Sequence, residues 1–294
     1  MIGLMRPEWQ KVIRNYLVTG SLVWVYPIGV IATFGLALLV GWISEDARQG
    51  MLVVSSGQWT LDALWIWAFI TSFPASIFGW MLPLSFVAVV FAGEYQAGTW
   101  KNLVPRSRRT PLMLSKFITL TLIMMVSFVI TSIIVGLGQT LFHSAAGVAY
   151  GPALTSTTLA SFLGDYSREA LLTMSTLLIL AGFASLGALI SHSMLGSLLI
   201  GFGLSLLELL SHLLLRLLSG LLNAATLVNL YQFTPSYSVQ NIRSWLITNS
   251  AQTQGLAGFT AQPTLVFSII VLAAWIIGLI GSATAIFQRQ DIVS

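Results

Sequence analysis

Residues 22–43 read LVWVYPIGVIATFGLALLVGWI, and this stretch decides what kind of fold the chain can adopt. It contains no charged residue, and an α-helix of this length, rising about 1.5 Å per residue, crosses the roughly 30 Å hydrocarbon core of a bilayer. Similarly apolar segments follow along the chain at about 64–92, 117–142, 170–190, 194–222 and 264–287. The sequence therefore predicts an all-α integral membrane protein whose residues 1–294 form one domain with six transmembrane helices.

The composition of the whole chain points the same way. Of its 294 residues, 56% are hydrophobic and only 7% are Asp, Glu, Lys or Arg, whereas soluble domains average about 25% charged residues. So few charges, together with so much apolar surface, exclude a soluble or a disordered protein. The absence of cysteine excludes disulfides and thiolate metal sites, and with only three histidines we expect no bound metal.

The distribution of Lys and Arg predicts the orientation in the membrane, because cytoplasmic loops carry an excess of these residues. With a cytoplasmic N-terminus, the inner segments hold Arg6, Lys11, Arg14, Lys101, Arg106, Arg108, Arg109, Lys116 and Arg289. The outer loops hold only Arg48, Arg168 and Arg243. We therefore expect both termini to be cytoplasmic. Since the basic residues follow the topology and do not gather on one face, we expect no nucleic-acid partner.

Residues 1–21, which precede the first span, predict an amphipathic helix lying at the membrane interface. Apolar residues recur there at the spacing of one helical face: Trp9, Val12, Ile13, Tyr16 and Leu17. The opposite face carries the basic residues Lys11 and Arg14. A helix of this kind suits the inner membrane surface, so membrane lipid is an expected partner.

The loop 93–116 is the most informative polar segment. It reads GEYQAGTWKNLVPRSRRTPLMLSK and carries five positive charges against one negative charge. We expect a short helix before Pro105, with Trp100 as an apolar anchor of the kind enriched at interface hot spots. Glu94 is expected to fix the loop at the membrane border, and Gly98 to permit a close backbone approach. The alternative is that the cations only enforce the orientation of the chain.

This segment resembles the permease subunits of ABC-2 type ATP-binding cassette transporters. Those chains carry Glu-x3-Gly-Thr, then a Pro and basic residues, then a Lys that opens the third span; the matching residues here are Glu94, Gly98, Thr99, Pro105, Arg106, Arg108, Arg109 and Lys116. The sequence FQRQDI at 287–292 also looks like the family's ending. The sequence Gly-Thr-Trp-Lys-Asn-Leu is similar to the corresponding segment of permeases associated with peptide-antibiotic export and immunity.

The resemblance implies an exporter of the bacterial cytoplasmic membrane, in which the loop 93–116 forms a coupling helix that docks on a separate ATPase subunit. The residues it assigns to this contact are Glu94, Gly98, Thr99, Trp100, Arg106, Arg108 and Arg109. It also implies a second permease chain, identical or different, and ATP and Mg²⁺ bound by the ATPase chains. The sequence is consistent with ATP binding on a separate chain, because it contains no G-x-x-x-x-G-K-[ST] phosphate-binding loop. We therefore expect neither a cofactor nor enzymatic activity in this chain.

The span 194–222 contains the acidic residue that lies deepest in the membrane. If this span is one helix, a polar stripe falls within an arc of about 80°; it consists of Gly201, Ser205, Glu208, His212, Arg216 and Ser219. Ionisable residues inside a span face protein or water, so the stripe either lines a translocation path or joins helices or protomers. The candidate path residues are Ser205, Glu208 and His212, with Phe69 and Phe73 from an aromatic stripe in 64–92 that packing would also explain.

The outer loop 223–263 is long for a segment without structure. Its short apolar pieces at 227–233 and 245–247 can fold back as partial helices, and related permeases have re-entrant helices at this place. From the sequence alone, both an irregular loop and re-entrant helices remain open.

Two other classes of function are weighed against the permease. A secondary transporter or channel without an ATPase partner would also span the membrane several times, but the sequence has no visible inverted repeat. An intramembrane zinc protease would use His-Glu-x-x-His, whereas the chain offers only Glu208-Leu-Leu-Ser-His212. Co-purification of the chain with an ATPase would distinguish the permease hypothesis from that of a secondary transporter or channel.

Overall fold

The computed structural model describes residues 9–12, 14, 16–46, 55–71, 76–100, 108–252 and 258–290. This part of the chain is helical, without strands apart from an isolated bridge between Gln58 and Gly151. The helices are α2 (Tyr16–Leu22), α3 (Val25–Ile43), α5 (Trp59–Asp62), α6 (Trp65–Thr71), α7 (Ser76–Gln96), α9 (Arg109–Ala146), α10 (Ser156–Ser191), α11 (Met194–Leu209), α12 (Ser211–Leu221), the 3₁₀ helix η2 (Ala225–Phe233), α13 (Pro235–Thr248) and α14 (Leu265–Arg289). The predicted all-α fold is confirmed for these residues.

Four helices within the described ranges are long and apolar enough to cross a bilayer, namely α3, α9, α10 and α14. The pair α11 and α12 gives a fifth span if its two parts are counted together, although they meet at a bend of 58°. The predicted second span, 64–92, falls on α6 and α7. Between them, residues 72–75 lie outside the described part, and Phe73 is among them. Six spans therefore stay a prediction.

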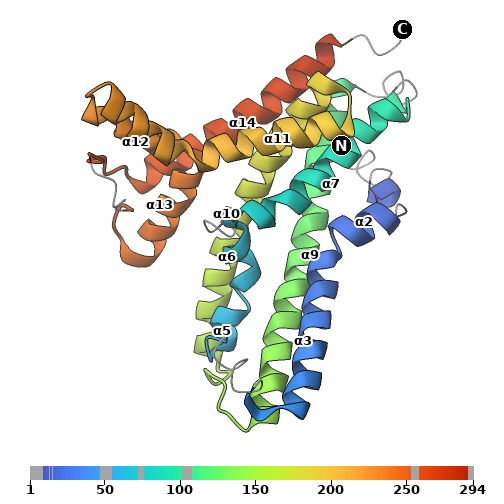
Figure 1. Ribbon diagram of the computed structural model, residues 1–294, viewed down its shortest axis with the longest axis vertical. Helices are drawn as coiled ribbons and strands as arrows, with labels where there is room; N and C mark the ends of the chain where they lie inside the picture. The colour runs from blue at the N-terminus through green and yellow to red at the C-terminus, as the bar shows by residue number, and fades with distance from the viewer. Residues whose placement is uncertain are drawn as a thin grey trace.

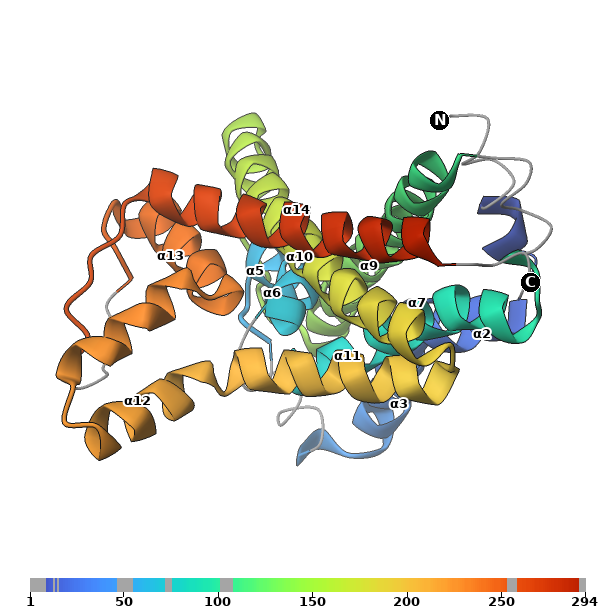
Figure 2. The ribbon, with the colours of Figure 1, turned by 90° about the horizontal axis from the view of Figure 1, so that it is seen from above.

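The ends of several helices lie together at one end of the molecule (Figure 1). Helices α3, α9 and α10 run beside one another along the longest axis, and α14 runs obliquely across α10 (Figures 1 and 2). Helix α10 packs against α7, α11 and α14, and α3 packs against α9. The C-terminal end of α7, the beginning of α9, the C-terminal end of α14 and the segment α2 all lie toward the same end (Figure 1).

The hairpin of α10 and α11 has the expected short connection. His192 adopts a left-handed conformation with φ 53° between the two helices, and Ser193 caps α11 by accepting a bond from the N–H of Gly196. Small residues let the two helices approach closely: a Cβ on Gly201 would lie 3.0 Å from Cα of Ala184. The hydroxyl of Ser197 also donates to the carbonyl of Ala184 at 2.7 Å.

The polar stripe expected on 194–222 is corrected by the structure. Helix α11 ends at Leu209 and α12 begins at Ser211, so Ser205 and His212 do not share one straight helical face. No Pro or Gly stands at this point of the sequence, which is why a continuous helix was expected. The bend accompanies packing of α12 against η2, a contact between segments that the local sequence does not reveal.

The segment expected either as an irregular loop or as partial helices is largely helical. Thr234 caps α13, accepting a bond from the N–H of Tyr237, and Pro235 occupies the first turn. The side-chain amide of Asn241 donates to the carbonyl of Pro263 at 3.0 Å and to the hydroxyl of Ser268 at 2.8 Å. These bonds hold α13 against the beginning of α14.

Candidate functional site

The site begins where α7 ends. Gly98 has φ +62°, its N–H donates to the carbonyl of Tyr95 at 3.1 Å, and the N–H of Thr99 donates to the carbonyl of Glu94 at 3.1 Å. This pair of bonds is the Schellman motif that ends many helices with a left-handed glycine. A Cβ on Gly98 would meet no atom within 4 Å. The glycine therefore serves the left-handed turn, and a close backbone approach by a partner stays a prediction.

The carboxylate of Glu94 gathers three donors from separate parts of the chain, and we call this group the Glu94 cluster. It accepts a bond of 2.9 Å from Nζ of Lys116, and further bonds from Nζ of Lys11 and Oγ1 of Thr99. The side chains of Glu94 and Lys116 are 3% and 1% exposed, whereas that of Lys11 is 50% exposed. Buried charges persist only when they are paired and hydrogen-bonded, and both conditions hold here.

The electrostatics of the Glu94 cluster keep the carboxyl ionised. Burial raises the pKa of Glu94, but the charge of Lys116 and the hydrogen bonds from Lys11, Thr99 and Lys116 together outweigh burial and lower that pKa to about 2. The ammonium group of Lys116 also lies 5.1 Å from the ring centroid of Trp100, an arrangement that favours the cation. Glu94 is therefore ionised at neutral pH.

Trp100 is buried beneath this cluster. It is 1% exposed, and the centroid of its ring lies 4.6 Å from that of Phe287 and 5.7 Å from that of Tyr95. The predicted apolar anchor is therefore buried within this chain, and its contact with a partner stays a prediction. The ring of Trp100 joins the loop after α7 to the end of α14.

Arg109 contacts the C-terminal end of α14. Its NH1 donates to the carbonyls of Phe287, Gln288 and Gln290 at 3.0, 2.7 and 2.7 Å. The last carbonyls of a helix lack partners within the helix, so Arg109 at the beginning of α9 caps the end of α14. Arg108 is exposed. Arg106 lies outside the described residues, as does the segment 101–107 where most of the coupling helix was predicted.

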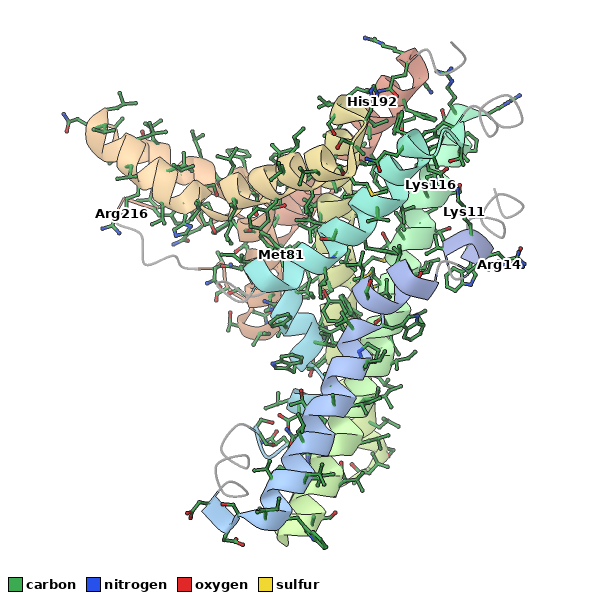
Figure 3. The ribbon with its side chains drawn as sticks, turned by 45° about the vertical axis from the view of Figure 1, so that its right-hand side comes forward. Lys11, Arg14, Met81, Lys116, His192 and Arg216 are labelled. Carbon is green, nitrogen blue, oxygen red and sulfur yellow. The ribbon has the colours of Figure 1, made fainter. Side chains whose placement is uncertain are left out.

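Gln290 adds to the contact between the end of α7 and the end of α14, although no periodicity or spacing in the sequence marks it as a candidate residue. Its side-chain oxygen accepts a bond from the hydroxyl of Tyr95, and its amide donates to the carbonyl of Leu189 at 2.7 Å and lies 3.1 Å from Nε2 of His192. His192, Lys116 and Lys11 lie toward the same end of the molecule (Figure 3). The sequence signal that points to Gln290 is the resemblance of the 287–292 segment to the ending of ABC-2 type permeases.

The comparisons with known proteins bear on this arrangement. The sequence model of the ABC-2 family transporter protein matches residues 4–180, more than half of the 294 residues. The chain belongs to this family. The match includes Glu94, Lys116 and Lys11 but ends before α11 and α14. No curated protein and no solved structure matches the chain.

Membership in the ABC-2 family fixes the general role. Such a chain is the membrane component of an ATP-binding cassette transporter and is not itself the catalyst. The apolar helices agree with a multi-pass membrane protein. Among the described residues, no group of three or more His, Asp or Glu side chains is placed to hold a metal ion.

Only part of the candidate path is brought together in this ABC-2 protein. Ser205 and Glu208 line one cavity of about 30 Å³, room for about one water molecule. Glu208 accepts bonds from the N–H and the hydroxyl of Ser236 at 2.6 and 2.7 Å, and so ties α11 to the first turn of α13. His212, beyond the bend, lies with its ring 5.9 Å from Tyr231. Phe69 stacks on Trp65 at 5.2 Å.

An ion pair between Arg243 and Glu169 also holds α13, and no sequence pattern predicts it. Nε and NH2 of Arg243 each donate to an oxygen of Glu169 at 2.7 Å. This two-pronged geometry is the strong form of an Arg–carboxylate pair. The sequence predicts only that Arg243 lies in an outer loop, and its distance along the chain from Glu169 gives no signal of pairing.

Proposed function

We propose that this ABC-2 family protein is the permease subunit of an ATP-driven exporter, working with a separate ATPase subunit and a second permease chain, identical or different. The observation that carries the proposal is the Glu94 cluster. It ties the last turn of α7 to α9 and to the N-terminal segment through buried or partly buried charges that are costly to separate, and Thr99 ties the loop after α7 to the same carboxylate. A partner that displaces this loop therefore moves several membrane helices together.

The ATPase supplies what the chain lacks. The sequence contains no phosphate-binding loop of the G-x-x-x-x-G-K-[ST] kind, so ATP and Mg²⁺ are proposed to bind to the ATPase subunit. The docking surface is proposed to comprise the loop 93–116. The conformation of this loop is proposed to depend on Glu94, Gly98, Thr99 and Trp100. The exposed Arg108, together with Arg106, is proposed to contact the partner.

We further propose six spans in a bacterial cytoplasmic membrane, with both termini on the cytoplasmic side. The excess of Lys and Arg in the assigned inner segments supports this orientation. The contacts of Glu94 with Lys11 and of Tyr95 with Gln290 support it too, since they bring residues near both ends of the chain to the end of α7. Cysteines introduced at Ser107 and Gln252 are expected to be labelled from opposite sides; labelling of both from one side contradicts this topology.

The proposed cargo is hydrophobic or amphipathic, a peptide, lipid or drug, moved outward. The low charge of the spans supports such a cargo. Ser205, Glu208, His212, Phe69 and Phe73 are the proposed contributors to the path. The bonds between Glu208 and Ser236 equally support a joint that controls the outer helix α13.

The test is reconstitution with and without the ATPase. The purified chain alone is expected neither to bind nor to hydrolyse ATP, and addition of the ATPase with which it co-purifies should give hydrolysis that responds to cargo. A Walker-lysine variant of the ATPase is the matched control and should assemble without hydrolysis. ATP hydrolysis by the isolated permease, or transport without any ATPase, contradicts the proposal and favours the secondary transporter.

A further inference from the structure

A cavity of about 260 Å³ lies between the N-terminal segment and α7. Most of its wall is apolar and is formed by Val12, Val18, Val89, Val90 and Met194. Lys11, Thr19, Glu94 and Thr99 add polar groups at one side. Pockets for complete small molecules measure about 300–1,000 Å³, so this cavity suits part of one long apolar chain better than a whole drug-sized ligand.

The place of the cavity in the chain indicates the membrane surface. It lies against α2 and the segment before it, which precede the apolar helix α3, and where α7 approaches its end. The wall residues Val89 and Val90 precede the polar Glu94 by about one helical turn. An occupant therefore meets apolar groups toward the membrane interior and charged groups toward the water.

Lys11 is free to serve a second anion. Its side chain is half exposed, and an ammonium group has three donors, of which Glu94 receives one bond. If the side chain of Lys11 rotated toward another anion, Glu94 would still accept hydrogen bonds from Lys116 and Thr99. Arg14, exposed on the same segment and shown with Lys11 in Figure 3, adds a second cation three residues along.

We propose that this cavity binds one anionic phospholipid. The phosphate lies between Lys11 and Arg14, and the upper part of one acyl chain lies against Val89, Val90 and Met194. The charge of the two side chains favours an anionic over a zwitterionic lipid, since each Lys or Arg near the surface strengthens binding to anionic lipid about fivefold. The lipid and Glu94 share Lys11, so the lipid content of the membrane acts on the Glu94 cluster. This inference does not depend on an ATPase partner.

The experiment measures lipid bound to the full chain in detergent by native mass spectrometry, titrating dioleoyl phosphatidylglycerol. The wild type should bind one molecule tightly and bind dioleoyl phosphatidylcholine more weakly. Arg14→Gln, which leaves the Glu94 cluster intact, should weaken the tight site about fivefold, and Lys11→Gln should do the same. Arg168→Gln, a partly exposed cation on α10, is the matched control and should bind like the wild type.

The apolar wall is tested separately. Val90→Trp fills the cavity and should abolish the tight site, whereas Val129→Trp, at an exposed position of α9, should not. Glycerol phosphate, which has the headgroup chemistry without acyl chains, should fail to compete at the concentration at which the lipid saturates. Unchanged affinity in both Arg14→Gln and Val90→Trp overturns the proposal. Equal competition by glycerol phosphate also overturns it, because it would identify a site for free phosphate only.

Discussion

Nζ of Lys116 donates a hydrogen bond of 2.9 Å to Oε1 of Glu94, and the two side chains are 1% and 3% exposed. The bond joins the last turn of α7 to the second turn of α9 across the loop that separates them. Charges buried to this degree are costly to separate. The ends of the two helices are therefore expected to move as a unit whenever the intervening loop is pushed or pulled.

The first prediction concerns this pair. Glu94→Gln should destabilise the protein by roughly 3–5 kcal/mol, because it leaves the Lys116 ammonium buried without its carboxylate. Lys116→Met should also destabilise the protein, because it leaves the buried carboxylate of Glu94 without the Lys116 ammonium group. The double variant should lose much less than the sum of the two, and thermal unfolding in detergent would measure this. Strict additivity would show that the pair does not couple the helices.

The second prediction is the pH dependence of the same group. The pKa of Glu94 is lowered in the folded protein from 4.5 to about 2, so its contribution to stability is complete above pH 4.5 and is lost as pH falls toward 2. The difference in unfolding temperature between the wild type and Glu94→Gln should stay constant from neutral pH to 4.5 and shrink below it. Asp165→Asn, in an exposed pair with Arg168, provides the comparison. A difference that shrinks well above pH 4.5 would contradict the lowered pKa.

The third prediction concerns Trp100. Trp100→Ala removes a buried ring and should cost about 3–5 kcal/mol; it should also reduce capture of the ATPase, or uncouple hydrolysis from transport, without preventing membrane insertion. Trp100→Phe should be far milder, because the ring contact with Phe287 can persist and the indole N–H has no partner among the described residues. Pull-down and transport assays compare them. Full coupling in Trp100→Ala and in Glu94→Ala would exclude this loop as the coupling element.

The fourth prediction separates two neighbouring arginines. Arg109→Ala should lower stability and loosen the end of α14, since three carbonyls lose their donor. Arg108→Ala, at an exposed position, should change stability by less than about 0.5 kcal/mol. Hydrogen exchange at 285–290 measures the loosening directly. Equal protection in the two variants would show that Arg109 does not cap α14.

The fifth prediction concerns the joint between α11 and α13. Glu208→Gln keeps one acceptor and should retain most of the folded protein, whereas Glu208→Ala should expose α13 to protease. Adding Ser236→Ala to Glu208→Ala should cost little more, because Glu208→Ala already removes the bond to the hydroxyl of Ser236 together with the bond to its N–H. Transport assays on Glu208→Gln ask whether the carboxylate also serves the path. Unchanged transport with unchanged protection of α13 would exclude both roles.

The helical membrane fold and the family could be read from the sequence because both depend on local features. A run of apolar residues is long enough to span a bilayer whatever surrounds it. The family pattern of glutamate, glycine, threonine, proline and basic residues lies within the short segment 93–116. The left-handed turn at Gly98 and the capping residues Ser193 and Thr234 are likewise local. Their physical causes act between residues close in the chain.

Only the tertiary structure decided how the polar residues are used. Glu94 meets Lys11 and Lys116, and Glu208 meets Ser236, across separations that no periodicity of the sequence encodes. The burial of Trp100 against Phe287 and the bend after Leu209 likewise depend on which helices pack together. Burying a charged group is costly unless a partner offsets its desolvation, and helix packing determines which partner comes within reach.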